Sequence, residues 1–141
     1  MLGDQHPDTL RSINNLGLLY LNTGRNLEAE SLLRTALSSY EKAFPDSWER
    51  YSCQSMLGAS LTGQKKYQDA EPLVIDGYEK MVQRKATIPA GISSPLEQAG
   101  QRIVRLYRNW GKADQAAEWT RTTSDHSKAA RSPIGGPRGA P

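Results

Sequence analysis

The chain has 141 residues, of which 37% are hydrophobic and 7% aromatic, and its formal net charge is +3. This length suits one domain, and the polar composition favours a soluble helical protein over a deep globular core. A single cysteine excludes an intrachain disulfide, and no apolar run is long enough for a membrane span or a signal peptide, so we expect a cytoplasmic protein.

The first helix pair is predicted at about residues 9–44. One apolar stripe at helical spacing covers residues 10–20, and a second covers residues 32–40. Either Asp8 or Thr9 is the candidate N-cap of the first helix. The alternation of apolar and polar residues that would indicate a strand is missing from this region.

Two further helix pairs are predicted at about residues 47–86 and 95–122. Ser47 is the candidate N-cap of the second pair. Two prolines and a glycine in residues 87–95 predict a loop between the pairs. From residue 124 to residue 141 the sequence is rich in Gly, Pro and Ser and has no hydrophobic period, which predicts a disordered basic tail.

Positive charge is concentrated toward the C-terminus. From Gly100 onward the chain has eight Lys or Arg residues against three Asp or Glu, whereas residues 1–99 have ten against twelve. We therefore expect any electrostatic recognition of an acidic partner to involve the last third of the chain.

The helix pairs are copies of one repeat. Residues 13–33 recur at an offset of 41 as residues 54–74, and more weakly at an offset of 87 as residues 100–120. The positions that coincide carry a core residue or a small residue where helices approach closely. They are Leu16, Gly17, Tyr20, Ala29 and Ala36 in the first copy, Leu57, Gly58, Ala70 and Gly77 in the second, and Tyr107 and Ala116 in the third.

Each copy resembles a tetratricopeptide repeat (TPR), a helix-turn-helix unit that stacks on its neighbours. The phrase "HPDT…NNLGLLY…GR…EAESLLRTAL" in residues 2–43 is similar to the longer kinesin-light-chain type of repeat. The second copy is similar to repeats near the C-terminal end of bacterial serine/threonine protein kinases, but no catalytic phrase of those kinases is present. The resemblance implies an all-α fold, a short α-solenoid of about three antiparallel helix pairs over residues 1–123, with a disordered tail at residues 124–141.

The third copy departs from the repeat pattern. It has Gly100 where the first copy has Ile13, and Val104 where the first copy has Gly17. We therefore expect this copy to act mainly as a cap on the array.

In this family the first helices of the repeats line a concave groove, and the resemblance implies a role as a protein–protein interaction module without catalysis or cofactors. The implied groove positions are Arg11, Asn14, Asn15, Leu18 and Leu21, then Ser52, Ser55, Met56, Ala59 and Thr62, and then Gln98, Gln101, Arg102, Arg105 and Arg108. The three arginines recur every three residues, which predicts one basic helix face.

The types of these groove side chains suggest the chemistry of the partner. Arginine forks bind carboxylates and phosphates, and asparagine can pair with an extended peptide backbone. The hypothesis is a protein or peptide partner with acidic or carboxylate groups; a solvated arginine face with no binding role is the alternative.

The histidines, the cysteine and the tryptophans are weaker candidates for functional sites. His6 and His126 have no cluster of ligands around them, so no metal site is predicted. Cys53 has no base to activate it and is expected to be a buried hydrophobe. Trp48, Trp110 and Trp119 lie near predicted helix ends and are expected to pack there, because tryptophan can bury its ring and keep its N–H hydrated; stacking on a ligand is the alternative.

Two alternative functions stay open. The chain could be the C-terminal regulatory segment of a bacterial serine/threonine kinase, or a nucleic-acid-binding protein that uses its basic last third. The opening phrase "LGDQHPDT" would join two units in this family, so we expect an uncapped N-terminal edge with parts of Leu10, Leu18 and Leu21 exposed. That edge would lead to self-association or continue a longer array.

Overall fold

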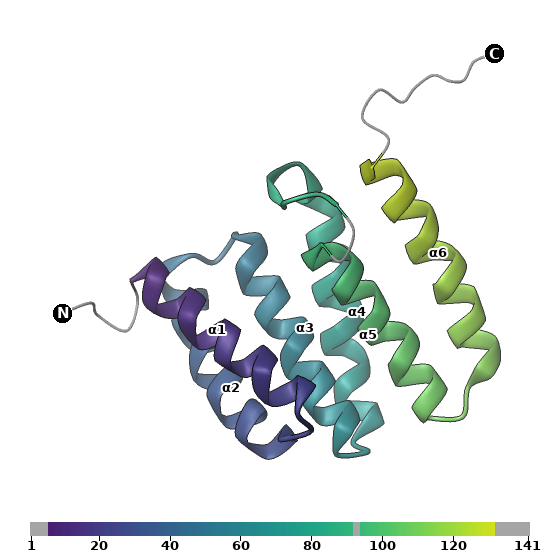
Figure 1. Cartoon of the computed structure of the whole chain (residues 1–141), viewed down its shortest axis with the longest axis horizontal. Coiled ribbons are helices and arrows are strands. Elements are labelled where there is room, and N and C mark those ends of the chain that lie inside the picture. The colour runs from purple at the N-terminus through teal and green to yellow at the C-terminus, as the bar shows by residue number, and fades with distance from the viewer. Residues whose placement is uncertain (1–5, 92–93, 132–141) are drawn as a thin grey trace, which may run out of the picture.

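The computed structural model describes residues 6–91 and 94–131. In this part of the chain six α-helices follow one another with no strand: α1 Pro7–Asn22, α2 Asn26–Ala43, α3 Trp48–Gly63, α4 Tyr67–Gln83, α5 Pro95–Asn109 and α6 Ala113–Arg131, with a short 3₁₀ turn at Lys85–Thr87. The helices form three antiparallel pairs side by side, with the α1–α2 pair and α6 at opposite ends (Figure 1). The all-α solenoid of three helix pairs is confirmed.

The helix starts follow from local chemistry. Ser47 caps α3 with its side chain, as predicted. At α1 the prediction of Asp8 or Thr9 is wrong, because the cap is His6, whose Nδ1 accepts a hydrogen bond from the Asp8 amide at 3.1 Å. The physical reason is Pro7: its fixed φ and missing N–H suit the first helical position, so the cap is the residue before it.

Small residues let the helices of a pair approach closely. A Cβ on Gly77 would lie 2.9 Å from the backbone oxygen of Tyr51, and a Cβ on Gly58 would lie 2.5 Å from a methyl carbon of Val74. Most of the repeat positions are buried, and Tyr20 is partly buried; the buried ones are Gly17, Ala29, Ala36, Leu57, Gly58, Ala70, Gly77, Tyr107 and Ala116. Leu16 contradicts the expectation of a core position, since it is 40% exposed.

α3 is the central helix and packs against α1, α2, α4 and α5. Its two sides belong to two hydrophobic clusters. Cys53, Met56 and Leu57 join the cluster of α1 and α2, whereas Tyr51 and Leu61 join the cluster of α4, α5 and α6. One side chain of α4, Leu73, packs against both clusters.

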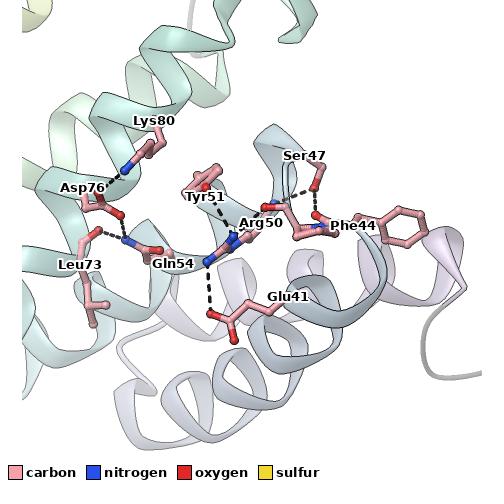
Figure 2. Close-up of polar contacts among 10 residues, drawn as sticks. Glu41, Phe44, Ser47, Arg50, Tyr51, Gln54, Leu73, Asp76 and Lys80 are labelled. Atoms are coloured by element: carbon pink, nitrogen blue, oxygen red, sulfur yellow. Dashed lines mark hydrogen bonds and ion pairs between the residues drawn. The ribbon is translucent and has the colours of Figure 1, made fainter.

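A polar network fastens the first pair to the second at the α2–α3 joint (Figure 2). Arg50 pairs with Glu41 at 3.6 Å and donates to the Pro45 carbonyl at 2.7 Å. Further along α3, the Gln54 side chain donates to Asp76 of α4 at 2.9 Å. These contacts hold α3 in register with the helices on both sides of it.

α6 corrects the predicted boundary of the tail, because the helix continues to Arg131 instead of ending near residue 122. Its later turns are anchored on α4: the Tyr78 hydroxyl lies 2.6 Å from His126 Nδ1, and Trp119 meets the Tyr78 ring edge to face. Sequence periodicity missed this extension because one histidine, not an apolar stripe, makes the contact. The rest of the predicted tail, residues 132–141, lies outside the described residues.

The N-terminal edge differs from the one predicted. Leu10 is fully buried, and Leu18 and Leu21 are partly buried, so these three do not form an open apolar edge. The exposed large hydrophobic residues of the described chain are Leu16 at 40%, Leu19 at 55% and Leu27 at 69%. An apolar edge is therefore present on α1, but Leu16 and Leu19 form it.

Candidate functional site

A trough runs across α1, α3 and α5, the first helices of the three pairs. One hollow of about 400 Å³ lies at the end where these helices begin, and a second of about 270 Å³ lies further along them. The two hollows share Leu18, Gln98 and Arg102 in their walls, so they form one continuous trough with Arg102 at its centre.

Most of the predicted groove residues come together in this trough. Arg11, Asn14, Asn15 and Leu18 all line the first hollow. The other predicted positions that line one or both hollows are Leu21, Ser52, Met56, Ala59, Thr62, Gln98, Gln101, Arg102 and Arg105. The three-helix trough implied by the family resemblance is thus present, while its binding role stays a prediction.

Arg108 lies elsewhere, so the arginine row does not form one face. With Arg105 it lines a third hollow of about 480 Å³ between α5 and α6, which borders the second hollow at Gln101, Arg105 and Asn109; Arg108 lines neither of the two hollows of the trough. An α-helix has 3.6 residues per turn, so each step of three residues turns the side chain back by roughly 60°. Over two steps the row rotates out of the trough, and only Arg102 and Arg105 face into it.

Arg102 is a partly buried cation at the centre of the trough. Its Nη1 donates to Ser55 Oγ at 3.1 Å, and none of the ion pairs among the described residues includes it. Burial lowers its pKa to about 10, and the neighbouring charge of Arg105 contributes to that lowering. A cation that has lost hydration without gaining a carboxylate is a site where an anion can be stabilised.

Asn14 lines the same hollow with a largely buried side chain. The residue is only 9% exposed, and its Nδ2 donates to the Tyr40 hydroxyl at 3.3 Å. Its Oδ1 has no hydrogen-bond partner and is shielded from solvent, so a ligand does not reach it in this conformation. Leaving a buried acceptor unpaired costs about 1–3 kcal/mol.

The walls of the first hollow include residues that the sequence did not suggest for binding. Trp48, Pro89 and Pro95 line it, and Glu49 adds one acidic group. Packing of a helix end was the favoured role of Trp48, and stacking on a ligand was the alternative. The sequence did contain a sign that this segment is unusual, because the third copy follows the second by 46 residues instead of 41. Pro89, which lines the first hollow, lies in the longer connection between these two copies.

The other candidate residues, Cys53 and Trp110, are buried or packed against neighbouring side chains. Cys53 is buried, its Sγ lies 3.5 Å from the Leu33 carbonyl, and burial raises its pKa to about 12. Trp110 stacks on Tyr67 at 5.6 Å between ring centroids, as expected for a residue at a helix end. Among residues 6–91 and 94–131, no three His, Cys, Asp or Glu side chains could hold a metal ion together.

None of the helices within the described ranges is both long and apolar enough to cross a bilayer. The longest, α6, carries several charged side chains along its length.

Comparison with known proteins identifies the repeat. Residues 9–49 match the tetratricopeptide repeat family model. No curated protein sequence matches the chain significantly. Solved structures do match, among them two crystal structures of nearly identical TPR-like repeats from Podosopora anserina, named for a putative kinesin light chain; one of the two carries a single substitution.

The structural likeness extends over nearly the whole chain. Both structures have 19% sequence identity with it, with TM-scores of 0.64 and 0.62, and each match covers 92% of this chain. The chain spans 60% of the length of each solved chain. Tetratricopeptide repeats, whose family model matches residues 9–49, generally bind proteins or peptides. The chain has the fold of a TPR-like solenoid.

Proposed function

We propose that the trough binds an extended peptide segment of a protein partner, and that the segment carries acidic or carboxylate groups. Arg102 is the observation that carries this proposal. It is a partly buried guanidinium with one hydrogen bond to Ser55, a lowered pKa and a second cation, Arg105, beside it. A carboxylate between these arginines would offset both the lost hydration and the repulsion between like charges.

Asn15 supports a peptide as the ligand. It is exposed and lines the first hollow, and its side-chain amide can donate to and accept from the backbone of an extended chain. An acidic peptide lying along the trough would place backbone amides near Asn15 and side-chain carboxylates near Arg102. Pockets along a continuous groove and main-chain hydrogen bonds together give such recognition its specificity and affinity.

A display experiment tests the proposal without knowledge of the natural partner. A random-peptide phage library is selected on the full chain, and the strongest peptide is then titrated as a labelled synthetic peptide against variants. Arg102→Gln should weaken binding by roughly 10- to 100-fold, since hydrogen bonds to charged groups contribute about 1.5–3 kcal/mol.

Arg108→Gln is the matched control. It removes the same charge from the same helix, but outside the trough, and should change affinity less than about threefold by long-range electrostatics alone. Selection of peptides without acidic residues, or equal losses in the two variants, would contradict the proposal.

Salt dependence separates this function from nucleic-acid binding. A nucleic-acid binder loses affinity steeply between low and physiological salt, whereas a groove that combines backbone hydrogen bonds and apolar contacts loses much less. The likeness of the second copy to repeats of bacterial serine/threonine kinases stays a prediction about the origin of the chain, and the coding sequence upstream of Met1 would test it.

A further inference from the structure

The three first helices carry the same stacking face, and only α1 leaves it uncovered. The repeat offsets align Leu16 with Leu57 and Ile103, and Leu19 with Ser60 and Leu106. The four counterparts in α3 and α5 are at most 2% exposed, since Leu57 is 2% and the other three are 0% exposed. Leu16 and Leu19 themselves are 40% and 55% exposed.

In each of the later repeats the second helix of the preceding pair packs against the first helix: α2 against α3, and α4 against α5. Leu57 belongs to the hydrophobic cluster that includes α2, and Ile103 belongs to the cluster that includes α4. The uncovered face of α1 is therefore suited to an apolar helix surface.

The opposite end of the molecule does not offer such a surface. The offset of 87 places Thr120 and Ser124 of α6 where α2 has Leu33 and Leu37, and both α6 residues are exposed. Leu33 and Leu37 pack in the cluster that Leu57 joins, and polar side chains on α6 would not replace them. Head-to-tail stacking of copies into a filament is thus disfavoured.

The face on α1 is complementary to itself. Ser12, Leu16, Leu19 and Thr23 follow one another at intervals of four, three and four residues, an order that reads the same in both directions. Two antiparallel copies of α1 would therefore place Leu16 against Leu19 of the other copy, and Ser12 against Thr23. Small residues at both ends of the face permit close approach of the two helices.

Charge on the surrounding surface does not oppose this contact. Asp8 pairs with Arg11 at 3.0 Å near the start of α1, and Arg25 pairs with Glu28 at 3.2 Å near the start of α2. Both signs are present at each end, so two copies would meet without net repulsion. We propose that this chain forms a twofold-symmetric dimer in which the Ser12–Leu16–Leu19–Thr23 face of α1 packs antiparallel against the same face of a second copy.

Sedimentation equilibrium of the full chain from micromolar to near-millimolar concentration tests the proposal. A reversible monomer–dimer equilibrium is expected. Leu19→Glu should raise its dissociation constant by roughly 100-fold or more, because the contact would bury an unpaired carboxylate. Since Leu19 is 55% exposed in the single chain, this variant should keep its helical circular dichroism.

Leu27→Glu is the matched control. Leu27 is 69% exposed, but its repeat counterpart Gln68 is exposed as well, so it lies off the stacking face. This variant should dimerise like the unmodified chain. A chain that stays monomeric throughout, or a dimer that tolerates Leu19→Glu or is lost equally in Leu27→Glu, would overturn the proposal.

Cross-linking tests the antiparallel order. Under mild oxidation, a mixture of Leu16→Cys and Leu19→Cys chains should form the mixed disulfide faster than either variant forms a disulfide with itself. The native Cys53 is buried and its pKa is raised, so it should not compete. Faster linkage of each variant with itself would contradict the antiparallel arrangement.

Discussion

α1 and α3 carry the same repeat positions but have different surroundings. In α1 the buried residues are Leu10, Asn14 and Gly17, whereas in α3 nearly every residue from Tyr51 to Thr62 is buried. The difference comes from their neighbours, since α3 lies between two helix pairs and α1 contacts only one side of the array. A repeat position thus specifies which face a residue lies on, while the neighbouring unit determines how much that residue contributes to stability.

Truncating the equivalent leucines gives the largest expected contrast. Leu57→Ala should lower the free energy of unfolding by about 2–5 kcal/mol, because it removes a side chain that is only 2% exposed and leaves a cavity. Leu16→Ala should cost less than about 1 kcal/mol, since that side chain is 40% exposed. Urea unfolding at low protein concentration measures both. Equal losses would mean that α1 and α3 have equivalent surroundings.

Adding a methyl group at a glycine where two helices approach closely tests the same difference between the repeats. Gly77→Ala should destabilise by about 1–2 kcal/mol, because the new Cβ would lie 2.9 Å from the backbone oxygen of Tyr51, which cannot move without α3. The Cβ of Gly17→Ala would meet a terminal methyl of Leu33 at 2.7 Å; Leu33 is fully buried, but a side chain yields more readily than a backbone. Since alanine also favours the helix, we expect a smaller loss of stability at Gly17 than at Gly77. A larger thermal shift for Gly17→Ala than for Gly77→Ala would contradict this ranking.

The anchor of α6 extends the comparison to the other end of the array. Tyr78→Phe removes the hydroxyl that lies 2.6 Å from His126 Nδ1 and should cost about 1 kcal/mol. Amide hydrogen exchange in residues 120–126 should accelerate, while exchange in α3 stays unchanged. Unaltered exchange in α6 would show that aromatic packing alone holds this helix.

The smallest effect is a pH dependence at the contact between α2 and α3. The hydrogen bond from Gln64, followed by the one from Arg34, lowers the pKa of Glu30. Because the folded pKa lies below the unfolded value of roughly 4.3, the contribution is present above that pH and is lost as the pH falls through the folded pKa.

The Glu30→Gln variant measures this contribution. At neutral pH it should lower stability by no more than about 0.5 kcal/mol, since solvent screens the pair. At a pH below both pKa values the variant and the unmodified chain should unfold alike. A difference that persists in acid would assign the effect to packing.

Local sequence signals were sufficient for the helices and for most of the trough. Helical periodicity and the serine cap of α3 were visible in the chain, and the repeat offset aligned the residues of α1, α3 and α5 that line the hollows. Contacts between distant residues were not visible. The docking of His126 on Tyr78, and the approach of Pro89 to the trough, depend on how the pairs stack in space.

The arginine row shows a limit of another kind. A spacing of three residues suggested one face, but the 3.6-residue period carries Arg108 out of the trough. The exposure of Leu16 was also missed, because sequence similarity between repeats does not report which of them has a covered neighbour.

Leu73 packs against both hydrophobic clusters, and this has a consequence for folding. Arrays of stacked repeats can melt one unit at a time when the interfaces between units are weak. Here a single side chain of α4 belongs to the packing on both sides of α3, so loosening of either end removes support from the other. The short array should therefore lose its structure in one cooperative step, with no populated state in which α1 and α2 are unfolded while α4 and α5 stay intact.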